Sequence, residues 1–517
     1  MLLINSGAYV GLEFQAEIGI IPPCMLPIGN KKLIELQIEQ AKKAFPDEMI
    51  VLSIPESYKL TINEDRLIKS LGIILQPVPD DFSLAESMLY VMNVQPSKGE
   101  GVRVLHGDTF ICDLPHGFDV IAVVEHRQGY NWRTETMVDG DVIWGGYFAF
   151  SSKLTLIKAL ATSKGNFVQA VENYRSQFMM QLEVIKDWHD CGHINTFFDT
   201  RAKITTQRSF NSLLIEGGVV TKSSHKALKM QAEINWFNAL PASLKKFRPQ
   251  FIESGVGEDG HQFYRIEFLS LLPLNELYVH GRNRLIFWQR IFNLIQEYFE
   301  LSARCMSFDD IWKQAIQHSS DRLYRNKTML RLEMFAKDSG KNLDEAVYYQ
   351  GKDLGSISQI AQNCIDKSLA LPCVPTVMHG DLCFSNMLFD PRGQRLKLID
   401  PRGIDEDDKL TIFGNQTYDL AKLAHSVIGM YDFIIAGRYQ IDEAAGSPAI
   451  IFDIDERLAR IQNAFLETEF IKEVGVKQIM PAVVLLFLSM IPLHDDRPDR
   501  QEAMMLNAFR LYHDFVI

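Results

Sequence analysis

A short polar run in the last third of the chain restricts the fold more than any other feature. Residues 377–386 read VMHGDLCFSN, and thirteen residues separate Asn386 from Asp400. The intervening segment is predicted to be a hairpin, with strands at 386–389 and 395–399 and the turn sequence DPRG between them. A hairpin returns to its starting point, so Asn386 and Asp400 are expected to lie together.

These residue types suit phosphoryl transfer from a nucleotide. Side-chain oxygens of Asn386 and Asp400 can hold Mg²⁺, which bridges the phosphates of ATP in such sites. Asp381 is expected to accept the proton of an attacking hydroxyl, and His379, grouped with it in the catalytic loop, to brace the loop by hydrogen bonding. The alternative is a solvated surface turn with scattered acids, but residue types, spacing and strand context agree with one another.

The run resembles the catalytic and metal loops of the aminoglycoside phosphotransferase and choline kinase families, relatives of protein kinases with His-Gly-Asp in place of His-Arg-Asp. Residues 418–423, YDLAKL, resemble the helix start that follows the metal loop there, in which Asp419 has a structural role. The resemblance covers roughly residues 206–517. It implies a bilobal protein-kinase-like domain, with a small lobe at 206–275 and a large helical lobe at 276–517. It also implies ATP and Mg²⁺ as cofactors and a small-molecule hydroxyl, on a sugar or amino alcohol, as acceptor.

The small lobe is expected to open with a hairpin and a helix. Strands at 212–215 and 219–222 flank the turn EGG, and a helical stretch follows at 226–240. In the kinase-like fold a Lys on the second strand bridges ATP phosphates and pairs with a Glu on the helix. Lys222 and Glu233 hold those positions.

Other parts of this half are less specific. Lys226 and Lys229 could compete with Lys222, which could also be an ordinary solvated lysine. The loop at 207–212, QRSFNS, is expected to cover the phosphates, and residues 264–269, YRIEFL, resemble the strand and hinge that receive adenine. Further helices are predicted at 282–301, 358–369, 419–436 and 455–473.

Residues 1–205 alternate short apolar strands with helical stretches, which predicts an α/β domain with a mostly parallel sheet covered by helices. Strands are predicted at 2–4, 49–54, 73–76, 102–105 and 120–124. Helices are predicted at 32–45, 83–93 and 152–161.

Five segments of this domain resemble, in family order, the sugar nucleotidyltransferase family. They are residues 23–35, Gln76-Pro77 with 83–87, HGD at 106–108, WGGYFAF at 144–150 and WHDCGH at 188–193. The resemblance implies a Rossmann-like fold and a sugar phosphate or nucleotide as ligand. It also implies that Gln76 contacts the nucleotide base and that Asp108 and Asp190 are metal ligands. From their residues alone, Asp108 could equally be a turn residue and Asp190 a helix N-cap.

The phosphate cradle of this domain departs from the family. Nucleotidyl transfer needs a glycine-rich cradle and cations that offset charge as pyrophosphate leaves. The family supplies an Arg in the cradle and a Lys after the proline. Here residues 5–13 read NSGAYVGLE, Cys24 stands at the Lys position, and Glu13 and Glu17 add negative charge. Two lost cations should cost about 3 kcal/mol each, so the fold is expected to bind rather than catalyse.

Composition limits the setting. A net charge of −12 argues against a nucleic-acid partner, and seven cysteines without a Cys-x-x-Cys pair favour reduced thiols in a cytoplasm. No basic leader precedes the first strand. The apolar run at 479–493 is interrupted by Pro481 and Pro492, so it is expected to be too short for membrane insertion and to form a buried helix.

Three functions remain open from the sequence. Two such domains suggest successive phosphorylation and nucleotide coupling of a sugar or alcohol for surface capsular or lipopolysaccharide assembly, an inference from domain pairing. The second function is a monofunctional kinase whose first domain recruits substrate or mediates homo-oligomerisation. The third is a nucleotide-binding scaffold, which the intact set of Asp381, Asn386 and Asp400 disfavours.

Overall fold

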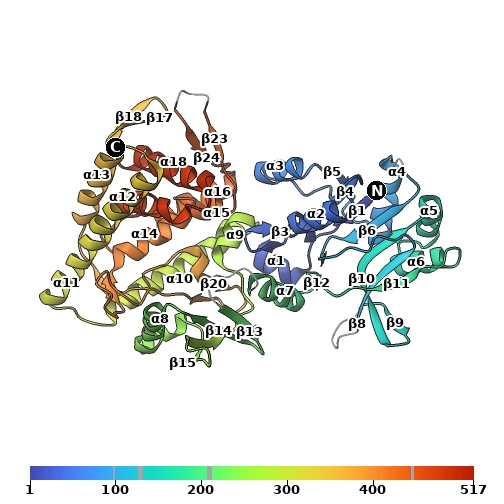
Figure 1. The fold of residues 1–517 in the computed structure, drawn as a ribbon, viewed down its shortest axis with the longest axis horizontal. Helices are drawn as coiled ribbons and strands as arrows, with labels where there is room; N and C mark the ends of the chain where they lie inside the picture. Colours follow the sequence, from blue (N-terminus) through green and yellow to red (C-terminus); the bar gives the residue numbers. More distant parts are fainter. Residues whose placement is uncertain (97–98, 126–131, 207–211, 444–446) are drawn as a thin grey trace. The chain divides into compact units, whose positions relative to one another are not determined.

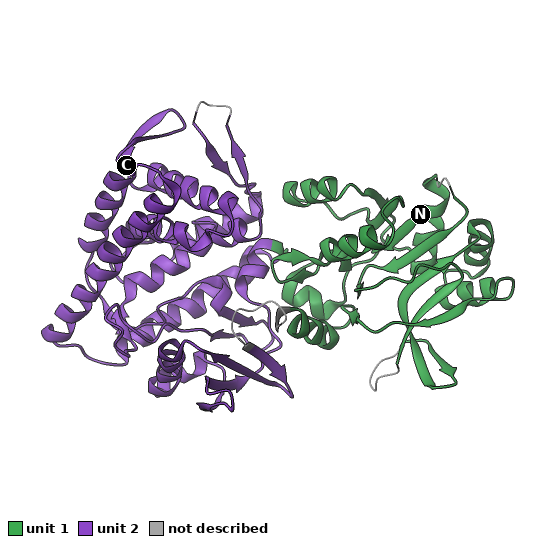
Figure 2. Ribbon diagram, viewed as in Figure 1, with its two compact units in different colours: residues 1–205, 280–282 green, residues 206–279, 283–517 purple. Residues whose placement is uncertain are grey.

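The computed structural model describes residues 1–96, 99–125, 132–206, 212–443 and 447–517 (Figure 1). These residues form two compact units (Figure 2). Unit 1 comprises Met1–Thr205 with His280–Arg282, and unit 2 comprises Thr206–Val279 with Asn283–Ile517. Each unit is described by itself below.

Unit 1 is built on an eight-stranded sheet in the order β11-β8-β10-β6-β1-β4-β5, with β9 paired to β10. The strands β6, β1, β4 and β5 run parallel, whereas β10 is antiparallel to its neighbours. The strand bounds are β1 Leu2–Asn5, β4 Ile50–Pro55, β5 Ile74–Val78, β6 Val102–His106, β8 Val120–Glu125, β9 Thr134–Met137, β10 Gly140–Phe150 and β11 Gln181–Val184. The predicted α/β class with a mostly parallel sheet is confirmed, and the five predicted strands lie within two residues of their observed bounds.

Seven helices of unit 1 are described, and buried apolar side chains of this unit form a core between sheet and helices. Continuous apolar strands such as β8 are typical of strands buried on both faces. The helix bounds are α1 Leu12–Ile18, α2 Leu33–Ala44, α3 Ile62–Leu71, α4 Leu84–Val94, α5 Lys153–Thr162, α6 Phe167–Arg175 and α7 Ile194–Thr206. Short strand pairs, β2 Pro27–Ile28 with β3 Lys31–Lys32 and β7 Thr109–Ile111 with β12 Trp188–Asp190, complete the unit.

Unit 2 begins with a four-stranded antiparallel sheet in the order β13-β14-β16-β15. Helix α8 (Ala227–Ala239) packs on this sheet through Phe237, whose ring contacts Phe251 and Tyr264. The strand bounds are β13 Ser212–Glu216, β14 Val219–Ser224, β15 Phe251–Val256 and β16 Gln262–Glu267. The predicted hairpin and helix therefore form, whereas residues 207–211 of the predicted phosphate-covering loop lie outside the described residues.

The rest of unit 2 is mainly helical (Figure 1). Its helices are α9 Leu274–His280, α10 Leu285–Arg304, α11 Asp310–Asp321, α12 Lys327–Ser339, α13 Ile357–Leu369, α14 Gln416–Val427, α15 Tyr431–Ile435, α16 Glu456–Glu467, α17 Met480–Met490 and α18 Pro498–Phe515. Small strand pairs are β17 Ala346–Tyr349 with β18 Lys352–Ser356, β19 Pro375–Val377 with β22 Phe413–Asn415, β20 Met387–Asp390 with β21 Arg395–Leu398, and β23 Gln440–Asp442 with β24 Ala449–Ile451. The helix predicted at 419–436 is divided in two because Met430 takes a left-handed φ of 57°.

The apolar run near the C-terminus is longer than expected. Helical turns on both sides of α17 extend it to a segment of 19 residues, Val476–His494. By length and composition this segment could cross a membrane, so the expectation that it is too short is wrong. Both prolines stand in the first turn of a helical segment, where proline is tolerated. The predicted burial is confirmed, because 72% of its most apolar window is buried inside the structure.

Candidate active site

The polar run forms a loop between β19 and the hairpin of β20 and β21. The hairpin pairs Met387 with Leu398, and the Ile399 N–H donates to the Asn386 carbonyl at 3.0 Å. The predicted hairpin is thus confirmed. Asp400 follows with a left-handed φ of 54°, a conformation that costs energy for a residue with a side chain and that often marks a functional position.

Asp381 is held by two side chains. The Asn386 amide nitrogen donates to one Asp381 carboxylate oxygen at 3.0 Å, and Lys422 Nζ lies 2.8 Å from the other. Burial raises the pKa of Asp381, but the Lys422 charge and these hydrogen bonds outweigh burial and lower it overall. Asp381 is therefore ionised at neutral pH and able to accept a proton.

The loop takes its shape from Asp419, in the first turn of α14. Its carboxylate oxygens accept the backbone N–H groups of His379 at 2.7 Å and Gly380 at 2.8 Å. Gly380 has a φ of +80°, and a Cβ there would lie 2.6 Å from Arg402 Cβ, so the turn requires glycine. These contacts agree with a structural role for Asp419.

His379 is completely buried and does not line the cavity. Its Nδ1 faces the Asp381 N–H at 3.3 Å, so Nε2 carries the proton and donates to the Ile399 carbonyl at 3.0 Å. Burial lowers the pKa of His379 to about 4, which keeps the ring neutral. His379 therefore braces the loop and is not placed to exchange a proton with a ligand.

Lys222 connects the four-stranded sheet, helix α8 and the loop that carries Asp400. Its Nζ lies 2.8 Å from Glu233 Oε2 and 3.0 Å from Asp400 Oδ1, and the Tyr264 hydroxyl also donates to Glu233 at 2.8 Å. Burial lowers the pKa of Lys222, but the two carboxylates outweigh burial and raise it. Of the competing lysines, Lys229 is 3.9 Å from Glu233 and exposed, so Lys222 is the one buried with it.

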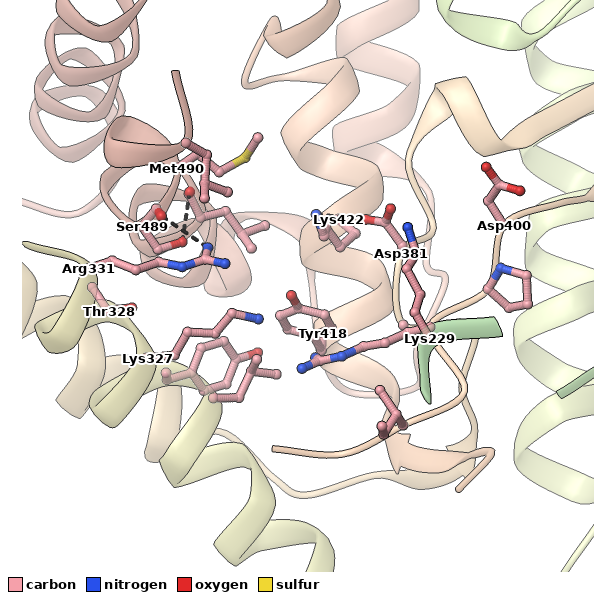
Figure 3. A pocket seen from close by; sticks show the side chains of 18 of the residues that line it. Lys229, Lys327, Thr328, Arg331, Asp381, Asp400, Tyr418, Lys422, Ser489 and Met490 are labelled. Atoms are coloured by element: carbon pink, nitrogen blue, oxygen red, sulfur yellow. Dashed lines mark hydrogen bonds and ion pairs between the residues drawn. The ribbon is translucent and has the colours of Figure 1, made fainter. Parts of the chain in front are cut away.

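A cavity of about 650 Å³ in unit 2 lies beside Asp381 and Asp400 (Figure 3). The sequence-predicted residues Glu233, Asp381, Asn386 and Asp400 all line it. Asn386 and Asp400 therefore share the cavity, although Asn386 bonds to Asp381 and Asp400 bonds to Lys222.

The sequence did not assign several cationic and aromatic residues of this cavity. They are Lys327, Arg331, Arg402, Tyr418 and Lys422. Lys422 stands three residues after Asp419, so the helical spacing could have placed it beside the loop. Lys327 and Arg331 lie on α12, a helix without a recognisable motif.

Unit 1 has a smaller cavity of about 220 Å³ near the ends of β1 and β6. Asp108 lines it, and a Cβ on Gly192 would lie 2.5 Å from Asp108 and 3.2 Å from Asp190, so the two carboxylates flank this glycine. Burial raises the pKa of Asp190, and the nearby Asp108 charge raises it further. The hydrogen bonds that Asp190 accepts lower its pKa but do not offset these two effects. No group of three or more His, Cys, Asp or Glu side chains suited to a metal occurs among the described residues.

The remaining unit 1 positions give this cavity no positive charge. Gln76 donates to its neighbour's carbonyl and accepts from Gln95, and it does not line the cavity. Cys24 is buried, and burial raises the pKa of its thiol to about 12. Lys32 is buried in an ion pair with Glu64 at 3.0 Å. The residues that line the cavity within the described chain include no Lys or Arg.

No family model matches the sequence, and no curated protein matches it. Solved structures similar to the chain fall into the two groups that its halves resemble. A nucleoside-diphosphate-sugar pyrophosphorylase from Vibrio cholerae is 15% identical over 39% of this chain and 99% of that chain, with a TM-score of 0.33. HddC from Yersinia pseudotuberculosis is 16% identical over 39% of this chain and 98% of that chain, with a TM-score of 0.29. The protein in the GDP complex of aminoglycoside 2'-phosphotransferase-IIIa is 13% identical over 59% of this chain and 91% of that chain, with a TM-score of 0.36.

Replacement of Lys422 by Met should raise the pKa of Asp381, because burial then acts without the opposing charge. An activity that needs ionised Asp381 should therefore fall on acidification at a higher pH in the variant than in the wild type. The profile of kcat/KM against pH measures this shift. Lys422→Arg keeps the charge and serves as the control; equal profiles for Met and wild type would contradict the assignment.

The full chain should show no nucleotidyl transfer from any nucleoside triphosphate to a sugar phosphate above background, because no Lys or Arg of the described part of unit 1 lines its cavity to stabilise departing pyrophosphate. Pyrophosphate release across the common triphosphates and several hexose 1-phosphates measures this activity. Robust turnover that Asp108→Asn abolishes would show that unit 1 is catalytic.

Proposed function

We propose that this chain is a phosphotransferase that moves the γ-phosphoryl group of ATP to a hydroxyl of a small molecule, a sugar or an amino alcohol. The observation that carries the proposal is the meeting of two ion-paired sets at one cavity: the pair of Lys422 with Asp381 lines it, and Glu233 and Asp400, which also line it, hold the buried Lys222 behind them. A base beside a phosphate-binding cation is the arrangement that phosphoryl transfer requires.

In this proposal Asp381 accepts the proton of the attacking hydroxyl. Lys422 keeps the carboxylate ionised, and the Asn386 amide fixes its orientation. Lys222 holds the phosphates in place of its present partner Asp400, while Glu233 fixes the position of the Lys222 ammonium beside the cavity. His379 and Asp419 hold the loop and do not touch the reacting atoms.

The donor set fits Mg²⁺. Asn386 uses its amide nitrogen on Asp381, which leaves its carbonyl oxygen as a hard oxygen ligand, and the Asp400 carboxylate is 48% exposed at the cavity. Mg²⁺ prefers such oxygens together with substrate phosphates. When bound, the ion would offset negative charge on the transferred phosphate.

Unit 1 supports a second proposal. We assign residues 1–205 to a nucleotidyltransferase-like domain and residues 206–517 to the kinase-like domain. Among the residues that the structure describes, no Lys or Arg lines the unit 1 cavity, which favours binding of a sugar phosphate or nucleotide, or homo-oligomerisation, over catalysis there. From the pairing of the two domains we further propose that the protein activates sugars in the cytoplasm for the assembly of surface polysaccharides. The alternative function is that of a nucleotide-binding scaffold.

Asp381→Asn should lower kcat about 10²–10⁴-fold, because the amide cannot accept the hydroxyl proton. ATP affinity should stay near the wild-type value, since the phosphates are held by Lys222. Steady-state phosphorylation and nucleotide titration calorimetry measure the two effects, with Asp338→Asn, an exposed position on α12, as the matched control. A near-normal kcat would rule out Asp381 as the base.

Asp400→Ala should weaken binding of magnesium–ATP at least about tenfold, because one of two side-chain ligands is lost. Binding of ATP measured in EDTA should change much less. Calorimetry with and without Mg²⁺ separates the two effects, and GTP in parallel tests nucleotide preference. An equal loss in both conditions would mean that Asp400 does not act through the metal.

A further inference from the structure

One side of the unit 2 cavity is strongly basic. Four cations line it and are here called the cationic wall: Lys327 and Arg331 of α12, Arg402 after the metal loop, and Lys422 of α14. Among the described residues, two carboxylates form ion pairs with them. Asp381 pairs with Lys422 at 2.8 Å, and Glu406 contacts Arg402 closely and Lys327 at 3.9 Å.

Arg331 adds a positive charge to the cationic wall that no described carboxylate offsets in an ion pair. It donates to the backbone carbonyl of Ser489 at 3.0 Å, and no described carboxylate lies within 4.0 Å of it. Burial, together with the charges of Arg402 and Arg331, lowers the pKa of Lys327 to about 7, in spite of Glu406. Lys327 therefore loses part of its charge near neutral pH unless an anion binds beside it, whereas Arg331 keeps its charge without a carboxylate partner.

The wall lies where the acceptor must enter. Asp400, which pairs with Lys222, lies on one side of Asp381, and Lys327, Thr328 and Arg331 lie on the other (Figure 3). A general base contacts the group whose proton it accepts. The nucleotide phosphates belong with Lys222, so the wall faces the acceptor.

We propose that the acceptor carries an anionic group, a phosphate or a carboxylate, in addition to the hydroxyl that is phosphorylated. This inference rests on the proposed kinase function and names its substrate class. The guanidinium of Arg331 can bind either anion through paired N–H groups, with Lys327 beside it as a point charge. Buried or half-buried apolar side chains beside the wall would contact the carbon skeleton: Leu323, Leu485, Leu486 and Met490. A cationic amino alcohol would instead meet like charges.

The reaction balances without any further reactant. The acceptor oxygen forms a bond to the γ-phosphorus of ATP as the bond from that phosphorus to the bridging oxygen breaks. The hydroxyl proton passes to Asp381, and ADP leaves with the electron pair of the broken bond. The anionic group on the acceptor takes no part in bond changes and only fixes its position.

The test compares matched acceptors with the full-length protein and magnesium–ATP. A hexose, its monophosphates, the corresponding uronic acid, choline and an aminoglycoside differ in charge while each offers a hydroxyl. We expect kcat/KM for an anionic acceptor to exceed that of its neutral counterpart at least about tenfold. The phosphate and uronate arms distinguish the two anions.

Variants of the wall locate the effect. Lys327→Met and Arg331→Met should each raise KM for the anionic acceptor about tenfold or more, while KM for ATP stays unchanged. Lys337→Met makes the same change on the exposed side of α12 and should alter neither constant. Loss of ATP affinity with normal acceptor KM would assign the wall to the nucleotide and overturn the proposal.

The outcomes separate this inference from the kinase proposal. Better turnover of neutral or cationic acceptors would overturn the anionic class and leave the kinase function standing. If no acceptor turns over, calorimetry of the same sugar phosphates with ADP and Mg²⁺ decides: binding lost in Lys327→Met supports the wall as an anion site, and no binding to the wild type refutes it. Circular dichroism of each variant shows whether it is folded.

Discussion

Two hydrogen bonds from consecutive backbone N–H groups to the Asp419 carboxylate are the constraint on which the candidate site depends. One carboxylate at the start of α14 fixes the peptide planes of His379 and Gly380, and Asp381 follows directly. The same helix supplies Lys422, which sets the charge state of Asp381. Because a single rigid helix determines both the shape of the loop and the ionisation of its carboxylate, the two properties cannot vary independently.

The sheet of unit 1 and the hairpin of unit 2 could be predicted closely because their signals are local. Continuous apolar runs mark β1 and β8, and a turn sequence between short strands marks β20 and β21. The ends of elements could be predicted less closely. The helix predicted at 419–436 is broken at Met430, because this residue has a left-handed backbone that a methionine in the sequence does not indicate.

The site could be predicted only in part. Asp381, Asn386 and Asp400 were predicted from residue types and spacing around the hairpin, whereas Lys222 and Glu233 were predicted from the resemblance to the kinase-like fold. The contact between Lys222 and Glu233 could be predicted, but the contact between Lys222 and Asp400 could not, since it joins positions 178 residues apart. The cationic wall was missed for the same reason: packing of α12 and α17 brings Arg331 to Ser489, and neither helix carries a motif.

The backbone of Gly403 lies directly against helix α8, where a Cβ would come within 2.0 Å of the Ala232 carbonyl oxygen. Ala232 is adjacent to Glu233, and Gly403 is three residues from Asp400, so this contact ties the helix to the metal loop. A movement of α8 toward that loop would drive its backbone into Gly403 unless the loop moved too. The contact therefore limits how far the small sheet and α8 can close onto the loop that carries Asp400, and it requires glycine at position 403.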